Sequence, residues 1–181
     1  MRKDPRPLIV EFLPRLRRFS YALTGDQDKG DDLVQETCAR ALSRLDQWEA
    51  GTRLDSWMFR IAQNIWFDQK RSQKVRGDVV DIDQMYDLPG EDGRDIMEER
   101  LTLKEVARGM KRLPNDQQML IALVCVDGLS YKEASDILEV PIGTVMSRLA
   151  RARRSLYEMA DPESEISPPI ELESRRGRTK R

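Results

Sequence analysis

Apolar residues recur at helical spacing through most of the chain, and the pattern is most telling between residues 131 and 156. Apolar positions in 131–138 fall on one helical face, Pro141 and Gly143 interrupt the pattern, and a second stripe follows. That stripe consists of Val145, Leu149, Ala152 and Leu156. Two short helices joined by a tight turn form a helix-turn-helix, whose second helix fits a DNA major groove.

The face opposite the second stripe carries positive charge and hydrogen-bond donors. Arginine that donates two hydrogen bonds to guanine is the commonest specific contact in the major groove. An ordinary basic amphipathic helix has the same appearance, and this segment alone does not distinguish the two. The candidate contacts to duplex DNA are Thr144, Ser147, Arg148, Arg151 and Arg154.

The same periodicity divides the rest of the chain into two helical units. Helices are predicted over about residues 7–24, 29–45 and 54–75. Pro14 predicts a kink or a restart in the first of them, because proline removes a backbone N–H and clashes with the preceding turn. No strand pattern and no repeat is present. The fold class is therefore all-α, with two small helical domains of which the second ends in the helix-turn-helix.

The second unit has four predicted helices over about residues 96–160. Asn115 and Gln118 are spaced as a capping box that opens a helix running to about Val126, and Ser130 caps the next. We therefore expect domains at 1–76 and 96–160, a flexible acidic linker at 77–95 and a disordered tail at 161–181. The tail ends in basic residues that are either solvated or in contact with DNA or the linker.

Charge is segregated along the chain rather than balanced locally. The net charge is only −1, but acidic residues concentrate at 26–36, 78–99 and 161–173, and basic residues at 60–76, 143–154 and 175–181. Acidic residues on the second helix favour either plain solubility or docking of a basic partner. Aromatic residues beside the basic third helix suit either a helical core or stacking on single-stranded bases.

Other chemistry is largely excluded by composition. The chain has no histidine, which removes the usual general base and the commonest metal ligand. Cys38 and Cys125 are isolated inside apolar patterns, where cysteine behaves as a small core residue. No apolar run has the length of a membrane span, and the N-terminus lacks a signal-peptide core. We expect a cytoplasmic protein that is not an enzyme, with no cofactor and no metal.

Five motifs occur in order across the two units. They are DDLVQET at 31–37, WxxGxxxxSWMFRIAQN at 48–64, RLP at 112–114, DGLSYKEASDIL at 127–138 and PIGTVMSRLARAR at 141–153. With these motifs, residues 8–158 resemble the extracytoplasmic-function (group IV) family of bacterial RNA polymerase sigma factors. The resemblance implies an alternative sigma factor that binds core RNA polymerase, recognises −10 and −35 promoter elements and serves a stress or signal-responsive regulon.

The resemblance also assigns roles to residues. It implies contacts to the clamp helices and flap of the polymerase, promoter DNA that is single-stranded at −10 and duplex at −35, and a probable anti-sigma factor. The resemblance assigns polymerase binding to Asp31, Asp32, Leu33, Gln35 and Glu36. It assigns binding of the −10 element to Trp48, Arg53, Ser56, Arg60, Asn64, Lys70, Arg71 and Lys74. It assigns binding of the −35 element to Thr144, Met146, Ser147, Arg148, Arg151 and Arg154.

Met146 departs from the family pattern, in which many members have arginine at this position. Methionine donates no hydrogen bond, so the preferred −35 sequence differs from the common one, or Met146 contacts a thymine methyl group or another part of the protein.

Two other functions are compatible with parts of the pattern. A conventional helix-turn-helix regulator would bind duplex DNA without polymerase, and would use its first unit to sense or to dimerise. A sigma mimic that titrates a regulator is the other alternative, but relatives of that kind carry a receiver domain, and no α/β segment is present.

Overall fold

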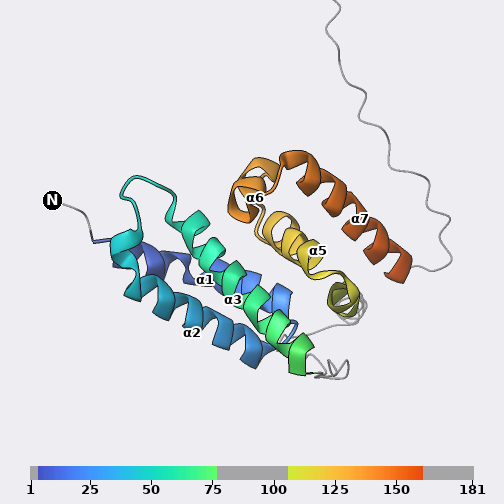
Figure 1. The fold of residues 1–181 in the computed structure, drawn as a ribbon, viewed down its shortest axis with the longest axis horizontal. Coiled ribbons are helices and arrows are strands. Elements are labelled where there is room, and N and C mark those ends of the chain that lie inside the picture. The colour runs from blue at the N-terminus through green and yellow to red at the C-terminus, as the bar shows by residue number, and fades with distance from the viewer. Residues whose placement is uncertain (1–3, 77–105, 161–181) are drawn as a thin grey trace, which may run out of the picture.

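The computed structural model describes residues 4–76 and 106–160, and every regular element in these ranges is helical (Figure 1). The all-α prediction is confirmed. None of the described helices combines the length and apolar character that crossing a membrane requires. The predicted acidic linker and the predicted disordered tail lie outside the described residues.

The first unit is a layer of three packed helices: α1 (Arg6–Thr24), α2 (Gln27–Ser43) and α3 (Leu54–Arg76). α2 packs on both of the others, and a short 3₁₀ helix, η1 (Leu45–Gln47), leads from α2 into the loop before α3. Phe59 of α3 lies at the centre, with its ring centroid 4.9 Å from that of Phe12 and 4.8 Å from that of Phe19. Aromatic pairs at this separation add to the stability gained from burial.

The junction between α1 and α2 is fixed by two residues. Gly25 ends α1 in the left-handed conformation (φ 61°), where its N–H donates to the Tyr21 carbonyl. The Asp26 side chain then accepts a hydrogen bond from the Lys29 N–H at 2.9 Å and caps α2. With Asp26 as the cap, α2 begins at Gln27, two residues before the predicted start.

A single helix passes through Pro14, so the restart, one of the two predicted outcomes, does not occur. Pro14 is exposed, and Val10, whose carbonyl loses its helical partner, is also exposed. Water can satisfy that carbonyl on the solvent side, while buried Phe12 and Leu16 keep the opposite side of α1 packed.

The second unit contains a helix over 106–112, then α5 (Asn115–Leu120), the π-helix η2 (Ile121–Val126), α6 (Tyr131–Leu138) and α7 (Ile142–Ala160). α6 and α7 pack on each other and form the predicted helix-turn-helix. Val145, Leu149 and Ala152 of the predicted stripe are buried, and Leu156 is partly buried against them.

The predicted capping box at Asn115 and Gln118 is wrong. Pro114 holds the N-cap position of α5 with no side-chain hydrogen bond. Gln118 is buried, and its side-chain amide donates to the Leu113 carbonyl at 3.1 Å instead of to the helix start. Burial of the glutamine beside the preceding helix therefore overrides the sequence pattern.

A capping box does open α6. The Ser130 hydroxyl accepts from the Glu133 N–H at 3.2 Å, and the Glu133 carboxylate accepts from the Ser130 N–H at 2.8 Å. Replacing Ser130 with alanine is expected to lower the free energy of unfolding by about 1 kcal/mol. Chemical denaturation measures this loss. Ser72→Ala, on the exposed surface of α3, is the control and should change stability by less than about 0.5 kcal/mol.

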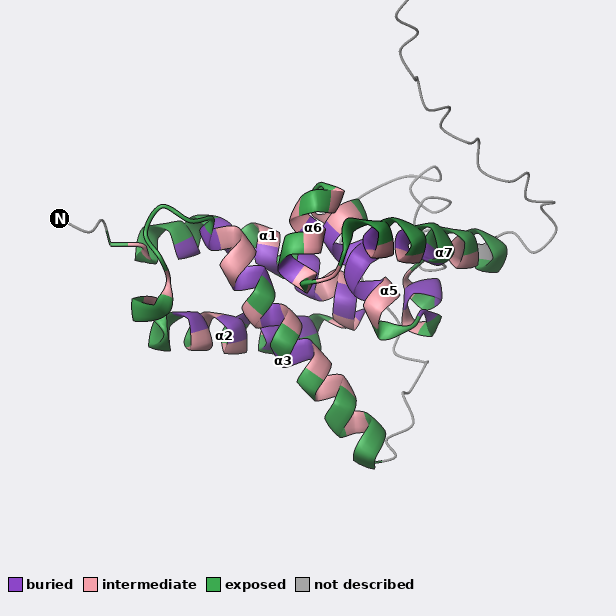
Figure 2. Ribbon diagram, turned by 45° about the horizontal axis from the view of Figure 1, so that its top comes forward, coloured by how far each residue is buried: buried purple, intermediate pink, exposed green. Residues whose placement is uncertain are grey.

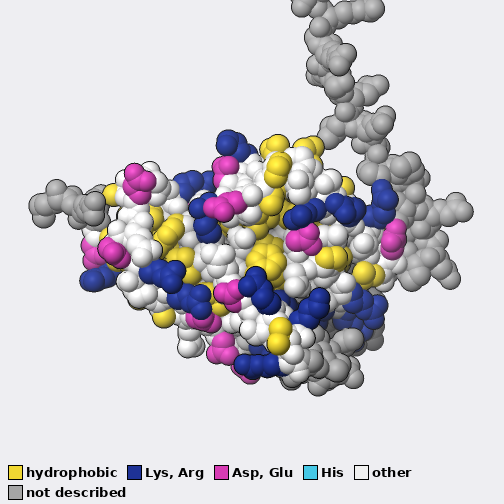
Figure 3. Space-filling model, viewed as in Figure 1, with side chains coloured by type: hydrophobic (Ala, Val, Ile, Leu, Met, Phe, Trp, Pro, Cys, Tyr) yellow, Lys and Arg dark blue, Asp and Glu magenta, His cyan; other side chains and the backbone are white. Residues whose placement is uncertain are grey.

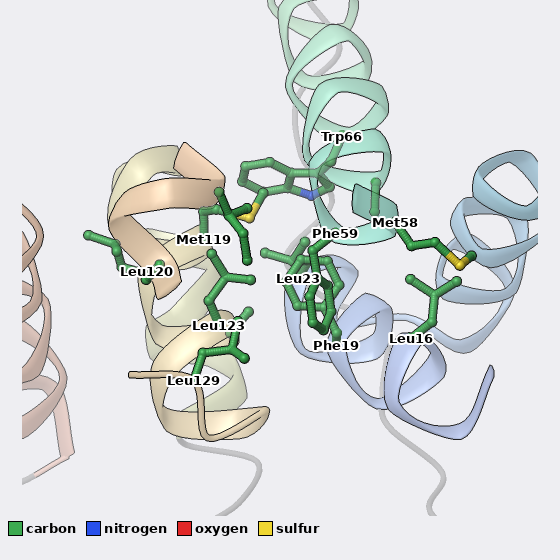
Figure 4. Close-up of a cluster of buried hydrophobic side chains, with 14 of the residues drawn as sticks. Leu16, Phe19, Leu23, Met58, Phe59, Trp66, Met119, Leu120, Leu123 and Leu129 are labelled. Atoms are coloured by element: carbon green, nitrogen blue, oxygen red, sulfur yellow. The ribbon is translucent and has the colours of Figure 1, made fainter. Parts of the chain in front are cut away.

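The two units pack directly on each other and share one core. α1 contacts η2, and α3 contacts both α5 and α6. Figure 4 shows the Trp66 indole of α3 beside Met119, with Leu123 next to Phe59 and Leu23. The buried residues are continuous across this boundary, whereas the C-terminal part of α3 extends beyond the body (Figure 2). The two helical units are therefore joined by one continuous set of buried residues.

Candidate nucleic-acid and polymerase interfaces

The exposed face of α7 carries most of the residues predicted to read duplex DNA. Figure 3 shows Lys and Arg side chains gathered along this helix. Thr144 is half-buried, and Ser147, Arg151 and Arg154 are exposed. Met146 is 52% exposed on the same helix, so it is not held in the protein core. The helix therefore offers a mixed face of donors, positive charge and one large apolar side chain.

Two of the arginines of α7 are already partly oriented. The Arg148 guanidinium pairs with the Asp116 carboxylate of α5 at 3.1 Å and is only one-third exposed. The Arg151 side chain donates to the Ser147 carbonyl at 3.3 Å, one turn earlier in α7. Arg148 thus helps to attach α7 to α5, and Arg151 extends along the solvent face of α7.

The residues predicted to bind the −10 strand spread along α3 and the loop before it. Trp48 and Ser56 are half-buried, and Trp48 packs against the core. The exposed members are Arg53, Arg60, Asn64, Arg71 and Lys74. The Arg71 guanidinium lies 3.7 Å from the Asp68 carboxylate. The exposed positions therefore run from the residue before α3 to its C-terminal part, and only Arg71 and Lys74 lie near its end.

Lys70 is held against Trp66 rather than extended into solvent. Its ammonium lies 5.5 Å from the centroid of the indole ring. Burial lowers the pKa of Lys70, and the positive charges of Lys29 and Lys111 lower it further. Lys70 is therefore a −10 candidate whose charge already rests on an aromatic ring of the protein.

Arg53 and Arg60 are both in contact with the second unit. The Arg53 guanidinium pairs with the Glu133 carboxylate of α6. The Arg60 guanidinium donates to the Asp136 carbonyl at 2.6 Å and pairs with Glu139 at 3.3 Å. These contacts join the start and the middle of α3 to α6.

A buried ion pair joins α1 to the end of η2. The Arg15 guanidinium contacts the Asp127 carboxylate at 2.6 Å, and the Asp127 side chain is fully buried. The hydrogen bond to Asp127 raises the pKa of Arg15. Arg18 is 3.5 Å from the same carboxylate. The sequence pattern did not identify this pair, because Asp127 followed by Gly128 has the appearance of a helix end.

Asp55 links that pair to the −10 candidates. It contacts Arg15 at 3.1 Å and Arg53 at 2.6 Å. Burial alone would raise the pKa of Asp55, but the hydrogen bonds from Arg53 and from the Ser56 N–H outweigh burial and lower it. Asp55 is therefore a charged link between Arg15 and Arg53.

The acidic face of α2 supplies the predicted polymerase contacts, with one correction. Leu33 is fully buried in the core, because it lies on the apolar stripe of α2, and it cannot belong to an exposed docking face. Asp32 and Gln35 are exposed. Asp31 accepts a hydrogen bond from the Tyr21 hydroxyl at 3.0 Å, and Glu36 pairs with Arg40 at 2.6 Å.

The described part of the chain shows no cluster of metal-ligating side chains. Residues 4–76 and 106–160 contain no group of three or more cysteine, aspartate or glutamate side chains placed to hold a metal ion. Cys38 and Cys125 are free thiols, and burial raises the pKa of Cys38.

Comparisons with known proteins match both units. A family model described as the Sigma2 domain of PhyR matches residues 9–63, and one described as Sigma-70, region 4 matches residues 103–156. The chain is 37% identical over 150 residues to the ECF RNA polymerase sigma factor EcfG of Rhodopseudomonas palustris (strain TIE-1), covering 82% of this chain and 80% of the relative. It is 34% identical over 151 residues to the ECF RNA polymerase sigma-E factor of Escherichia coli (strain K12), covering 78% of each.

A solved structure is also similar. The sigma factor RpoE from Bartonella quintana, in complex with the anti-sigma factor NepR, matches with a TM-score of 0.73 at 33% identity. The match covers 90% of this chain and 99% of that one. The similarity extends over both units rather than over the helix-turn-helix alone.

Proposed function

The chain belongs to the extracytoplasmic-function family of RNA polymerase sigma factors, and we propose that it reads the −10 element through α3 and its preceding loop and the −35 element through α7. It is an alternative sigma factor, and its region 4 match implies binding to promoter DNA and RNA polymerase. The proposal concerns which surfaces and residues carry these contacts. It places the protein in the cytoplasm with the polymerase, as an initiation factor rather than an enzyme.

The observation that carries the proposal is the solvent face of α7. A buried apolar stripe fixes this helix on α5 and α6, so Ser147, Arg151 and Arg154 are presented outward by a supported element. A helix held in this way is what major-groove readout needs. The first unit supplies a different chemistry, since exposed Arg71 and Lys74 near the end of α3 suit backbone phosphates of a melted strand.

We propose the exposed face of α2 as the docking site for the polymerase clamp helices, with Asp32 and Gln35 at its centre and Asp31 and Glu36 beside them. Region 4 is proposed to contact the polymerase flap. Carboxylates on a rigid helix suit a basic partner, and the ordered side chains of Asp31 and Glu36 limit the entropy lost on binding.

We propose that an anti-sigma factor controls the protein. The support is the similarity to RpoE of Bartonella quintana, which was solved in complex with the anti-sigma factor NepR. Such an inhibitor would cover the α2 face or hold the two units together, so that polymerase and promoter cannot reach their surfaces.

The test of the −35 assignment is the substitution Arg151→Ala. If Arg151 donates to a base, its loss should cost about 1–3 kcal/mol of promoter binding, which is roughly a 5- to 150-fold weaker complex. The measurement is titration of holoenzyme, reconstituted with core polymerase, against promoter DNA.

The matched control is Arg153→Ala. Arg153 is exposed on the same helix, but its guanidinium lies 3.6 Å from Cys125 Sγ, on the side that faces η2. This variant removes the same charge and should weaken binding much less. Equal losses in the two variants would mean that charge alone, and not base readout by Arg151, determines the affinity.

A further inference from the structure

The side of α6 that faces α3 presents oxygen atoms to the two arginines assigned to the −10 element. Arg53 pairs with the Glu133 carboxylate, and Arg60 contacts both the Asp136 carbonyl and the Glu139 carboxylate. Glu133 and Asp136 lie about one turn apart in α6, which places them on one side of the helix. Glu139 follows as the C-cap residue in the left-handed conformation (φ 54°). We call these three residues the acidic side of α6.

Oxygen atoms on this side offer a guanidinium the same chemistry as a nucleic-acid strand does. Arginine binds carboxylate and phosphate oxygens with the same planar set of donors. We propose that the acidic side of α6 is an internal docking surface for Arg53 and Arg60, and that it competes with the −10 strand for both arginines while the two units are packed together. This inference rests on the proposed function, because it takes the −10 strand as the competing ligand.

The competing contacts are weak enough to be displaced. The side chains of Arg53 and Arg60 are 50% and 46% exposed, and that of Glu139 is 72% exposed. Ion pairs with this exposure contribute little and weaken further in salt. A DNA strand brings several phosphates and gains from counterion release. The acidic side of α6 therefore binds the two arginines reversibly, and a DNA strand can displace it.

The packing of the two units does not depend on these carboxylates. Buried Asp127 holds Arg15 and Arg18, and the core continues through Trp66 and Met119. Removing the negative charge from α6 is thus expected to weaken its hold on the arginines and leave the units packed. Arg53 then keeps Asp55 as a partner, and Arg60 keeps the Asp136 carbonyl. Glutamine serves at the third position of a capping box, so Glu133→Gln also keeps the start of α6.

The experiment compares the full chain with its Glu133→Gln/Glu139→Gln variant. The probe is a fluorescein-labelled single strand of about twelve nucleotides with fully degenerate sequence, titrated at low salt and followed by anisotropy. The variant is expected to bind about three- to tenfold more tightly, which is the gain expected from removing two competing surface ion pairs.

The control is Glu11→Gln/Glu158→Gln, which removes two negative charges from exposed positions on α1 and α7. It should tighten binding by less than about twofold. In a background with Arg53→Ala and Arg60→Ala, the Glu133→Gln/Glu139→Gln substitutions should give no gain.

Three results would overturn the inference: an equal gain in the control, a gain that persists without the two arginines, or no gain at all. If no gain is seen while the parent chain still directs transcription with core polymerase, the sigma-factor assignment stands. The proposal that α6 competes for the two arginines then fails. If the parent chain directs no transcription, the proposed function fails and the inference fails with it.

Discussion

Replacing Trp66 with alanine is expected to lower the free energy of unfolding by about 3–5 kcal/mol, the range for deleting a large aromatic from a packed core. Trp66 is 1% exposed, and its indole lies between α3 and the second unit, where Met119 packs beside it (Figure 4). The substitution also removes the ring on which Lys70 rests. Denaturation by urea or guanidinium measures the loss.

Trp57→Ala is the control for that measurement. Trp57 also belongs to α3 but is half-buried, so its truncation removes less buried area and should cost less. Separate unfolding of the two units in the Trp66→Ala protein would show that this residue couples them. A loss no larger than that of Trp57→Ala would contradict the shared core.

Replacing Asp127 with alanine is expected to lower the free energy of unfolding by about 2–3 kcal/mol. Breaking a fully buried ion pair typically costs about 3–5 kcal/mol, because one charge stays buried without a partner. Here the loss is smaller, because the Arg15 side chain is 37% exposed and retains Asp55 as a partner. Thermal or chemical unfolding of the full chain measures the effect.

Asp136→Ala is the matched control for Asp127→Ala. The Asp136 carboxylate is 64% exposed and pairs with Lys132 at 3.4 Å within one turn of α6. An exposed pair of this kind is worth about 0.2–1 kcal/mol. Similar losses for the two aspartates would contradict the view that Asp127 anchors the second unit on α1.

The helices and their buried stripes follow from the sequence, because both depend on local spacing. The stripe of Val145, Leu149 and Ala152 and the end of α1 at Gly25 are where periodicity and turn chemistry place them. Local patterns failed where a longer-range contact took over. Gln118 has the spacing of a capping residue, but it is buried against the preceding helix and bonds to Leu113.

Helical periodicity does not predict how the two units pack on each other. A helical stripe indicates that one face of α3 is buried, but not that the neighbours of Trp66 come from a segment more than fifty residues later. Arg15 and Asp127 are likewise 112 positions apart. Arg15 belongs to none of the five motifs, and Asp127 only begins the fourth. The structure alone reveals that the arginines assigned to the −10 strand contact α6.

The sequence predicted the exposure of some candidate site residues correctly and of others wrongly. Exposed positions on α7 follow directly from the opposite apolar stripe, and Arg151 and Arg154 lie where the pattern indicates. Leu33 entered the docking set through a family motif, although its own helical position is on the buried stripe. A motif gives residue identities, whereas the helical face decides which of them a partner can reach.

The central claim is that one chain directs core polymerase to promoters through two separate readers. The most direct measurement is to purify the protein, reconstitute it with core RNA polymerase from its host, and sequence the 5′ ends of transcripts made from fragmented host DNA. The account predicts a limited set of start sites that share two upstream elements, with the Arg151→Ala protein losing signal according to the sequence of the distal element. Failure to bind core polymerase, or start sites with no shared elements, would contradict it.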